Sequence, residues 1–161
     1  MNKSATVQFS QTYLYKLHSL TNALDKAFDK VLQAHANLTL PQFMLLITVS
    51  ENGPINQRKA AQLLGISPAA VKRQTDIAID YGRLELALAD RSPGQNLQLT
   101  ARGRADIKKG LRSLEIHLFQ VFSDNHRSVD LMTHLNLLLG HTKGVLNKQA
   151  ASVTPIGKDR I

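Results

Sequence analysis

The sequence predicts a mainly α-helical protein that contains one small β-hairpin. In several long stretches apolar residues recur at steps of three and four, the spacing that places them on one face of a helix. Within residues 83–99, leucine alternates with other residues at the period of a β-strand. Glycine and proline separate these segments at points where helices end or begin.

The first two helices are predicted from an apolar stripe and a capping box. Phe9, Tyr13 and the apolar residues up to Val31 lie three or four positions apart, and no proline interrupts them. Thr39 is the expected N-cap of a second helix, with Gln42 as its capping-box partner. The sequence Asn-Gly-Pro ends this helix, because glycine tolerates the left-handed C-cap and proline cannot continue the hydrogen bonding.

Two short helices joined by a glycine follow. The first is expected to end at Leu64, and the second to run from Pro68 to about Tyr81 with Ser67 as its N-cap. Gly65 is expected to adopt a backbone conformation that a side chain would hinder. Ala61 must be small where the two helices touch, with Leu64 and Ile66 filling the space beneath them.

The remaining expected elements are the hairpin over residues 83–99 and two further helices. Thr100 is the expected cap of the fifth helix, and a sixth runs from about residue 127 to 148. The sixth helix is apolar on more than one side, so it must bury two faces, and a second subunit is the easiest cover. We therefore expect a homodimer, with these interface residues: Phe9, Tyr13, Leu118, Phe122, Leu131, Leu135 and Leu138.

The composition narrows the function classes. The 161 residues include no cysteine, which excludes a disulfide framework, a cysteine nucleophile and a thiol redox switch. No signal-peptide pattern is present, and no apolar run approaches the roughly 20 residues of a membrane span, so we expect a cytoplasmic protein. No phosphate loop, nucleophile elbow or paired-carboxylate motif is present, and the six histidines lack metal-ligand spacing. We expect neither an enzyme nor a metal or cofactor site.

The positive charge is concentrated in the middle of the chain. The formal net charge is +8, and residues 54–112 contribute +6 of it through eleven basic and five acidic residues. A basic segment suggests a polyanionic partner, most simply a phosphate backbone. A solvated basic face without a partner would give the same count, so charge alone leaves both interpretations open.

Two short helices joined by a glycine turn and followed by a hairpin form the pattern of a winged helix-turn-helix domain. In that arrangement the second helix lies in the DNA major groove, where its first turn reaches base edges, and a hairpin-tip arginine can enter the minor groove. Arginine can read guanine and glutamine can read adenine, while alanine allows close approach. The candidate DNA-binding residues are Asn56, Gln57, Ser67, Pro68, Ala69, Ala70, Lys72, Arg73, Gln74 and Arg91.

Residues 38–103 resemble the MarR family of transcription regulators. The resemblance rests on Leu-Thr-x-x-Gln at residues 38–42, on Leu-Gly-Ile-Ser-Pro-Ala-Ala-Val-Lys-Arg at residues 64–73, and on Leu-Thr-Ala-Arg-Gly at residues 99–103. The first hairpin strand departs from the family because it is apolar, and the hairpin is about one residue short, which shifts the register of Arg91.

The resemblance implies a homodimer on a pseudo-palindromic double-stranded operator, acting as a repressor. It also implies release by a small, often anionic or aromatic effector bound between the dimer region and the DNA-binding lobe. Two other functions stay open: a protein-interaction module that has lost DNA affinity, and a small-molecule carrier. The expected regions are a dimerisation helix (1–37), the winged helix-turn-helix domain (38–103), C-terminal dimerisation helices (104–150) and a flexible tail (151–161).

Overall fold

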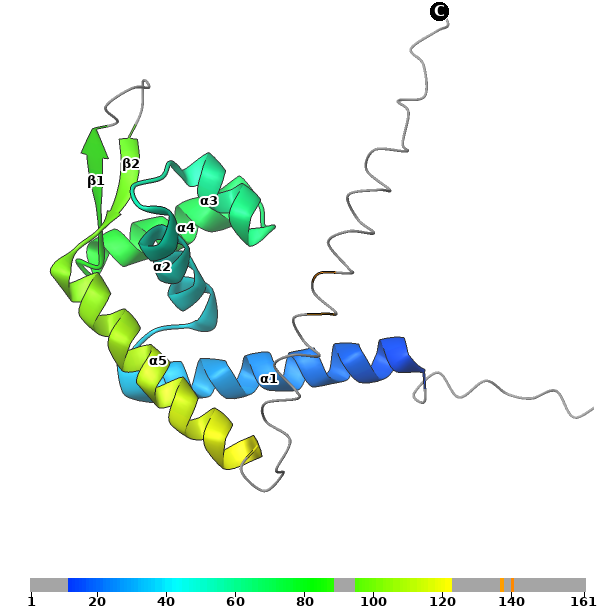
Figure 1. Ribbon diagram of the computed structural model, residues 1–161. Helices are drawn as coiled ribbons and strands as arrows, with labels where there is room; N and C mark the ends of the chain where they lie inside the picture. Colours follow the sequence, from blue (N-terminus) through cyan, green and yellow to red (C-terminus); the bar gives the residue numbers. More distant parts are fainter. Residues whose placement is uncertain (1–11, 89–94, 123–136, 138–139, 141–161) are drawn as a thin grey trace, which may run out of the picture. The chain divides into compact units, whose positions relative to one another are not determined.

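The computed structural model describes residues 12–88, 95–122, 137 and 140, and it confirms a mainly α-helical chain with one β-hairpin (Figure 1). The chain divides into two compact units, residues 1–117 and 118–161. No helix among the described residues is long and apolar enough to cross a membrane. The elements are α1 (Tyr13–Ala36), α2 (Leu40–Asn52), α3 (Gln57–Leu64), α4 (Pro68–Asp80), β1 (Leu84–Leu88), β2 (Gln95–Leu99) and α5 (Ala101–Phe122).

Polar caps fix where three of these helices begin, and the caps of α2 and α5 are the residues that the sequence predicts. Thr39 Oγ1 accepts the Gln42 N–H at 3.4 Å and Gln42 Oε1 accepts the Thr39 N–H at 3.0 Å, which completes the capping box of α2. Asn56 Oδ1 accepts the amide of the third residue of α3 at 2.8 Å. Thr100 Oγ1 accepts the amide three residues further on at 3.0 Å and so caps α5. Each cap satisfies an amide that has no partner within its helix.

The hairpin pairs β1 with β2 in antiparallel register, with Leu84 opposite Leu99 and Leu86 opposite Leu97. The segment between α2 and α3 lies along β2, because Ile55 and Leu97 exchange two backbone hydrogen bonds of 3.3 and 2.7 Å. The hairpin is thereby tied to the helices, and its tip, residues 89–94, lies outside the described residues.

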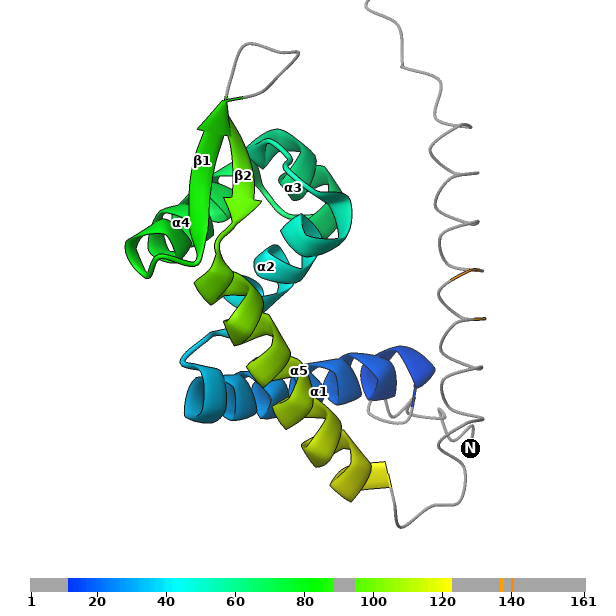
Figure 2. The same ribbon diagram turned by 60° about the vertical axis from the view of Figure 1, so that its left-hand side comes forward.

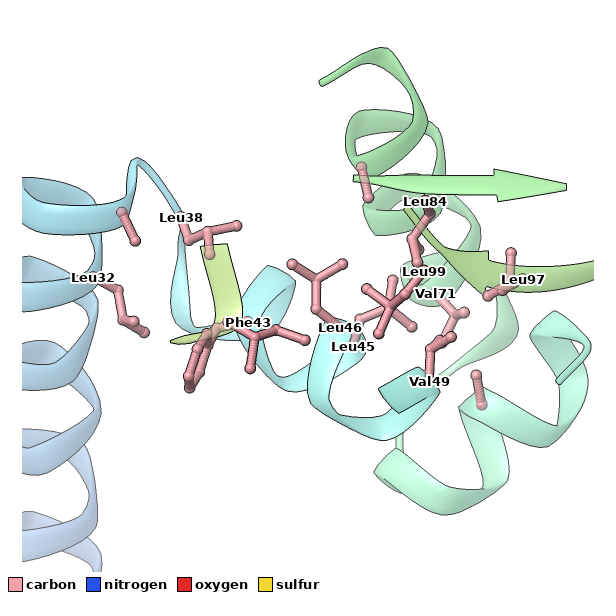
Figure 3. Packing of buried hydrophobic residues seen from close by; sticks show 14 of the residues in the cluster. Leu32, Leu38, Phe43, Leu45, Leu46, Val49, Val71, Leu84, Leu97 and Leu99 are labelled. Atoms are coloured by element: carbon pink, nitrogen blue, oxygen red, sulfur yellow. The ribbon is translucent and has the colours of Figure 1, made fainter. Parts of the chain in front are cut away.

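The core gathers residues from all five helices and both strands (Figure 3). Leu32, Leu46 and Leu97 are fully buried there. In both views α5 crosses the C-terminal half of α1 (Figures 1 and 2). A Cβ atom at Gly110 would lie 2.6 Å from Phe43 Cε2, so α5 approaches α2 at a distance that only glycine allows without a shift.

Three sequence expectations need comment. Ile66 is 42% exposed, so its predicted place beneath the helix-turn-helix is wrong. Leu64 is partly buried against the core and Ala61 is buried, as expected. The sixth helix lies outside the described residues except at positions 137 and 140, which are helical.

Candidate nucleic-acid interface

α3 and α4 pack against each other and against α2 as a helix-turn-helix. Gly65, at φ 66°, makes the turn, a left-handed conformation that glycine adopts without steric cost. Ser67 Oγ then accepts the Ala70 N–H at 3.2 Å, and Pro68 occupies the first helical position. The exposed N-terminal turn of α4 is therefore well defined, and the helix dipole makes it favourable for anions.

One face of α4 is exposed and carries most of its charge. Burial follows the helical period, since Val71, Gln74, Thr75 and Ala78 are buried. The exposed positions are Pro68, Ala69, Lys72, Arg73, Asp76 and Asp80. The N-terminal half of this face is basic and the C-terminal half is acidic.

Lys72 and Asp76 form an ion pair on that face. Lys72 Nζ lies 2.8 Å from Asp76 Oδ2, and the two side chains are 66% and 54% exposed. No ion pair is found for Arg73 among the residues that the structure describes. The two cations on α4 are thus unequal: one is partly neutralised and the other is free to meet a phosphate or a base.

Gln74 is the one candidate whose expected exposure is wrong. Its side chain is only 8% exposed, and its Oε1 atom is buried with no hydrogen-bond partner in the described structure. The spacing of positions 71, 74, 75 and 78 is the one that places residues on the same helix face, so the sequence already held the signal. Gln74 therefore belongs to the inward face of α4.

The structure brings most of the other candidates into two groups, whose members are exposed except for the half-buried Gln57 and Ala70. Ser67, Pro68 and Ala69 lie at the start of α4, with Ala70 half-buried beside them, and Lys72 and Arg73 follow one turn later. Asn56 and Gln57 lie at the start of α3, where Asn56 serves as its cap. The sequence interpretation did not include three exposed charged residues in the candidate site: the basic Arg58 and Lys59 on α3, and the acidic Asp76 on α4.

The hairpin and the dimer candidates are described only in part. Arg91, Phe9, Leu131, Leu135 and Leu138 lie outside the described residues, and Tyr13 and Phe122 are placed only as helical positions. Leu118 is half-buried on α5. On β1, the apolar strand of the hairpin, Leu86 is 43% exposed.

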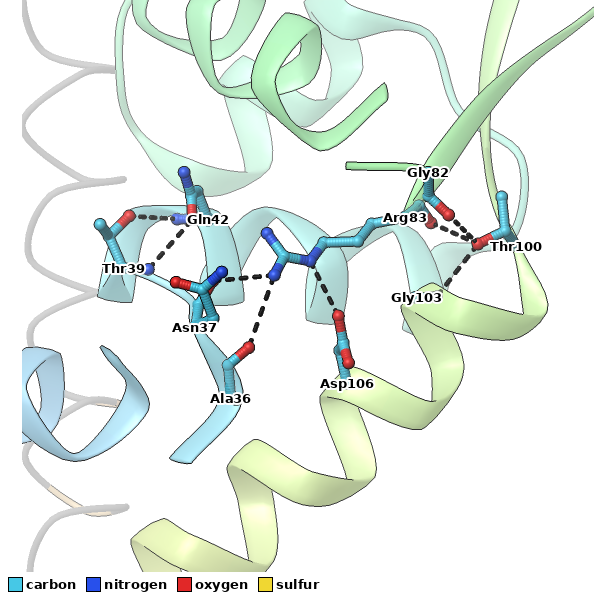
Figure 4. Close-up of polar contacts among 9 residues, drawn as sticks. All are labelled: Ala36, Asn37, Thr39, Gln42, Gly82, Arg83, Thr100, Gly103 and Asp106. Carbon is cyan, nitrogen blue, oxygen red and sulfur yellow. Dashed lines mark hydrogen bonds and ion pairs between the residues drawn. The ribbon is translucent and has the colours of Figure 1, made fainter. Parts of the chain in front are cut away.

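A buried arginine lies on the other side of α4, at its C-terminal end (Figure 4). Arg83 donates from Nε to Asp106 Oδ2 at 2.8 Å, and from Nη2 to Asn37 O at 2.8 Å and Ala36 O at 3.4 Å. Its guanidinium carbon lies 4.7 Å from the centre of the Tyr81 ring. One side chain thus joins the end of α1, the turn after α4 and α5. Sequence reasoning did not identify it.

A cavity of about 390 Å³ opens beside this arginine. Figure 4 shows that the third guanidinium nitrogen, Nη1, has no bond drawn to it and lies on the side of Gln42. The cavity therefore combines a buried cation, an aromatic ring and several amides. The lining residues are Gln33, Asn37, Leu38, Thr39, Gln42, Ile77, Tyr81 and Arg83.

The architecture is that of a winged helix-turn-helix protein. Comparison with solved structures shows which winged helix-turn-helix proteins have a similar fold. No protein-family model and no curated protein matches the chain. BldR from Sulfolobus solfataricus is similar with TM-score 0.70 and 19% identity over 80% of this chain and 92% of BldR. MarR from E. coli in its oxidised form is similar with TM-score 0.68 and 21% identity over 84% of this chain and 94% of MarR. MosR from M. tuberculosis, solved in complex with DNA, is similar with TM-score 0.64 and 18% identity over 84% of this chain and 98% of MosR. The chain has the fold of the MarR-type regulators, as the sequence resemblance predicted.

Proposed function

We propose that this protein is a dimeric DNA-binding transcription regulator, rather than an enzyme, that inserts α4 into the major groove of an operator. The observation that carries the proposal is the exposed N-terminal half of α4, where Lys72 and Arg73 follow a capped helix start. The similarity in fold to MosR, which was solved with DNA, supports it. The simplest consequence of operator binding is repression, because a bound dimer blocks promoter access.

Exposed apolar residues on α1 support the homodimer. Leu14, Leu17 and Leu20 are 80%, 58% and 56% exposed, a patch that water does not favour unless another surface covers it. Leu111 and Ile116 on α5 are also exposed. A second copy of the chain would cover such leucines and present two recognition helices to a pseudo-palindromic site, with half-sites about one DNA turn apart.

The cavity beside Arg83 is the place where we expect an effector. A planar carboxylate could bond to Nη1 of Arg83 and pack against the Tyr81 ring, whose residue ends α4. Binding there would disturb the link between α4 and the end of α1, and so the placement of the recognition helix. Benzoate is a suitable probe: it should weaken operator binding by the wild-type protein and leave unaffected the double variant Arg83→Met with Asp106→Leu, in which the cation and its carboxylate partner are both removed. Equal weakening of both proteins would reject this pocket.

The decisive test of DNA binding selects fragments from genomic DNA and measures their affinity. Arg73→Ala should weaken the selected operator by about 1–3 kcal/mol and blur its sequence preference. Arg112→Ala is the matched control, because it removes the same charge from an exposed position on α5. If neither wild type nor variants bind any fragment, the protein-interaction module becomes the better function, with the exposed Leu86 of β1 as its best evidence.

A further inference from the structure

Asp76 places a negative charge on the face of α4 that would enter the major groove. It lies one turn beyond Lys72 on the exposed stripe, and its side chain is 54% exposed. A carboxylate there is repelled by the DNA phosphates, so its presence lowers the affinity for DNA in general.

The stability of the fold does not explain why an aspartate stands at position 76. The bond from Lys72 Nζ to Asp76 Oδ2 is 2.8 Å long, but both side chains are mostly exposed, and pairs of that kind contribute little stability. The order, with the lysine before the acid along the helix, is also the weaker of the two arrangements. The ion pair does, however, place an acceptor and a donor side by side on the exposed face, 2.8 Å apart.

We propose, on the basis of the proposed function, that Lys72 and Asp76 read one C·G base pair together and that Asp76 selects the cytosine. In a C·G pair the N4 amino group of cytosine is hydrogen-bonded to O6 of guanine, which places the two groups about 2.9 Å apart. Both groups are also accessible from the major groove. Asp76 accepts the free N4–H and Lys72 donates to O6 of guanine, so the 2.8 Å separation of the ion pair matches the separation of these two groups.

The same chemistry disfavours the other base pairs. An A·T pair also offers an amino donor beside a keto acceptor, but adenine N7 is an acceptor next to that amino group and repels a carboxylate. Cytosine has a C–H group in the corresponding place. The reversed G·C pair exchanges donor and acceptor, so it puts keto oxygen against carboxylate. Cytosine is therefore the base that an acceptor-only side chain prefers.

The experiment measures affinity at fixed salt for operators that differ by one base pair at each position in turn. Wild type should prefer C·G at one position of each half-site. In Asp76→Asn the ratio of affinities for C·G over other base pairs at that position should fall by roughly 5- to 150-fold, the range for one good base contact. The same variant should gain affinity for adenine, because an amide reads adenine through N6 and N7. Asp76→Ala should lose the cytosine preference without gaining adenine. Asp80→Asn, which removes the same charge one turn further along the exposed face, should keep the wild-type profile.

The outcomes separate this inference from the proposed function. If wild type binds its operator with clear base preferences and Asp76→Asn shows the same preferences at every position, Asp76 does not read a base and only this inference is wrong. If wild type binds all sequences alike or none, the proposed function fails as well. A circular dichroism spectrum and unfolding curve for each variant establish that the altered preferences belong to folded protein.

Discussion

Arg83 joins three segments of the chain through one guanidinium group. It is 2% exposed, and its partners are the Asp106 carboxylate on α5 and two backbone carbonyls at the end of α1. A buried charge is tolerated only when such partners replace its water. The residue therefore fixes how the turn after α4 is placed against α1 and α5.

Loss of Arg83 should strongly destabilise the fold. Arg83→Ala leaves the Asp106 carboxylate, which is 20% exposed, without its cation, and should cost about 3 kcal/mol in the free energy of unfolding by urea. The double variant Arg83→Met with Asp106→Leu removes both charges and should lose much less. Equal losses in the single and double variants would show that packing, rather than the ion pair, is responsible.

Substitution of Gln74, in contrast to that of Arg83, is expected to leave the stability of the fold unchanged or to raise it. Its Oε1 atom and the Oγ1 atom of Thr75 are buried without partners in the described structure, which is costly for folding. Gln74→Met should leave the stability unchanged or raise it by about 1–3 kcal/mol, and should leave operator affinity unchanged. Thr75→Val is a second variant of the same kind, with the same expected direction. A tenfold loss of operator affinity in a fully folded Gln74→Met protein would return Gln74 to the DNA-reading surface.

At the level of the single element, we propose that the start of α4 contributes to both folding and DNA binding, and two substitutions separate these roles. Ser67→Ala removes the cap of the Ala70 amide and should cost about 1 kcal/mol of stability. Ser67→Asp keeps a capping oxygen but adds a negative charge where DNA is expected. It should retain the stability and lose operator affinity, as measured by thermal unfolding and by titration with DNA. Wild-type affinity in Ser67→Asp would mean that phosphates do not approach this turn.

The elements could be predicted because their boundaries are local. Thr39, Asn56, Ser67 and Thr100 each cap a helix through an amide three residues away, a relation that is legible along the chain. Which face of α4 is buried could also have been derived from the spacing of its apolar residues. The role of Arg83 could not, because its carbonyl partners are 46 and 47 residues distant and only the packed fold brings them together.

For the whole molecule, dimerisation is expected to depend on the exposed leucines of α1. Leu17→Glu places a charge in the proposed interface and should shift the protein to a monomer at micromolar concentration, measured by light scattering. Ser19→Glu adds the same charge about 160° further round the helix, also at an exposed position, and should remain dimeric. A monomeric wild type, or a dimeric Leu17→Glu protein, would show that this stripe is not the interface.

The central claim is that the basic half of α4, together with the basic residues of α3, binds the phosphates and the base edges of DNA. The measurement that tests it most directly is the affinity of wild type for its selected operator as a function of salt concentration. The logarithm of the binding constant should fall linearly with the logarithm of salt concentration, and Lys59→Ala, which removes one proposed phosphate contact, should reduce the slope by about 0.9. An affinity that does not change with salt, and that is the same for operator and scrambled DNA, would contradict the account.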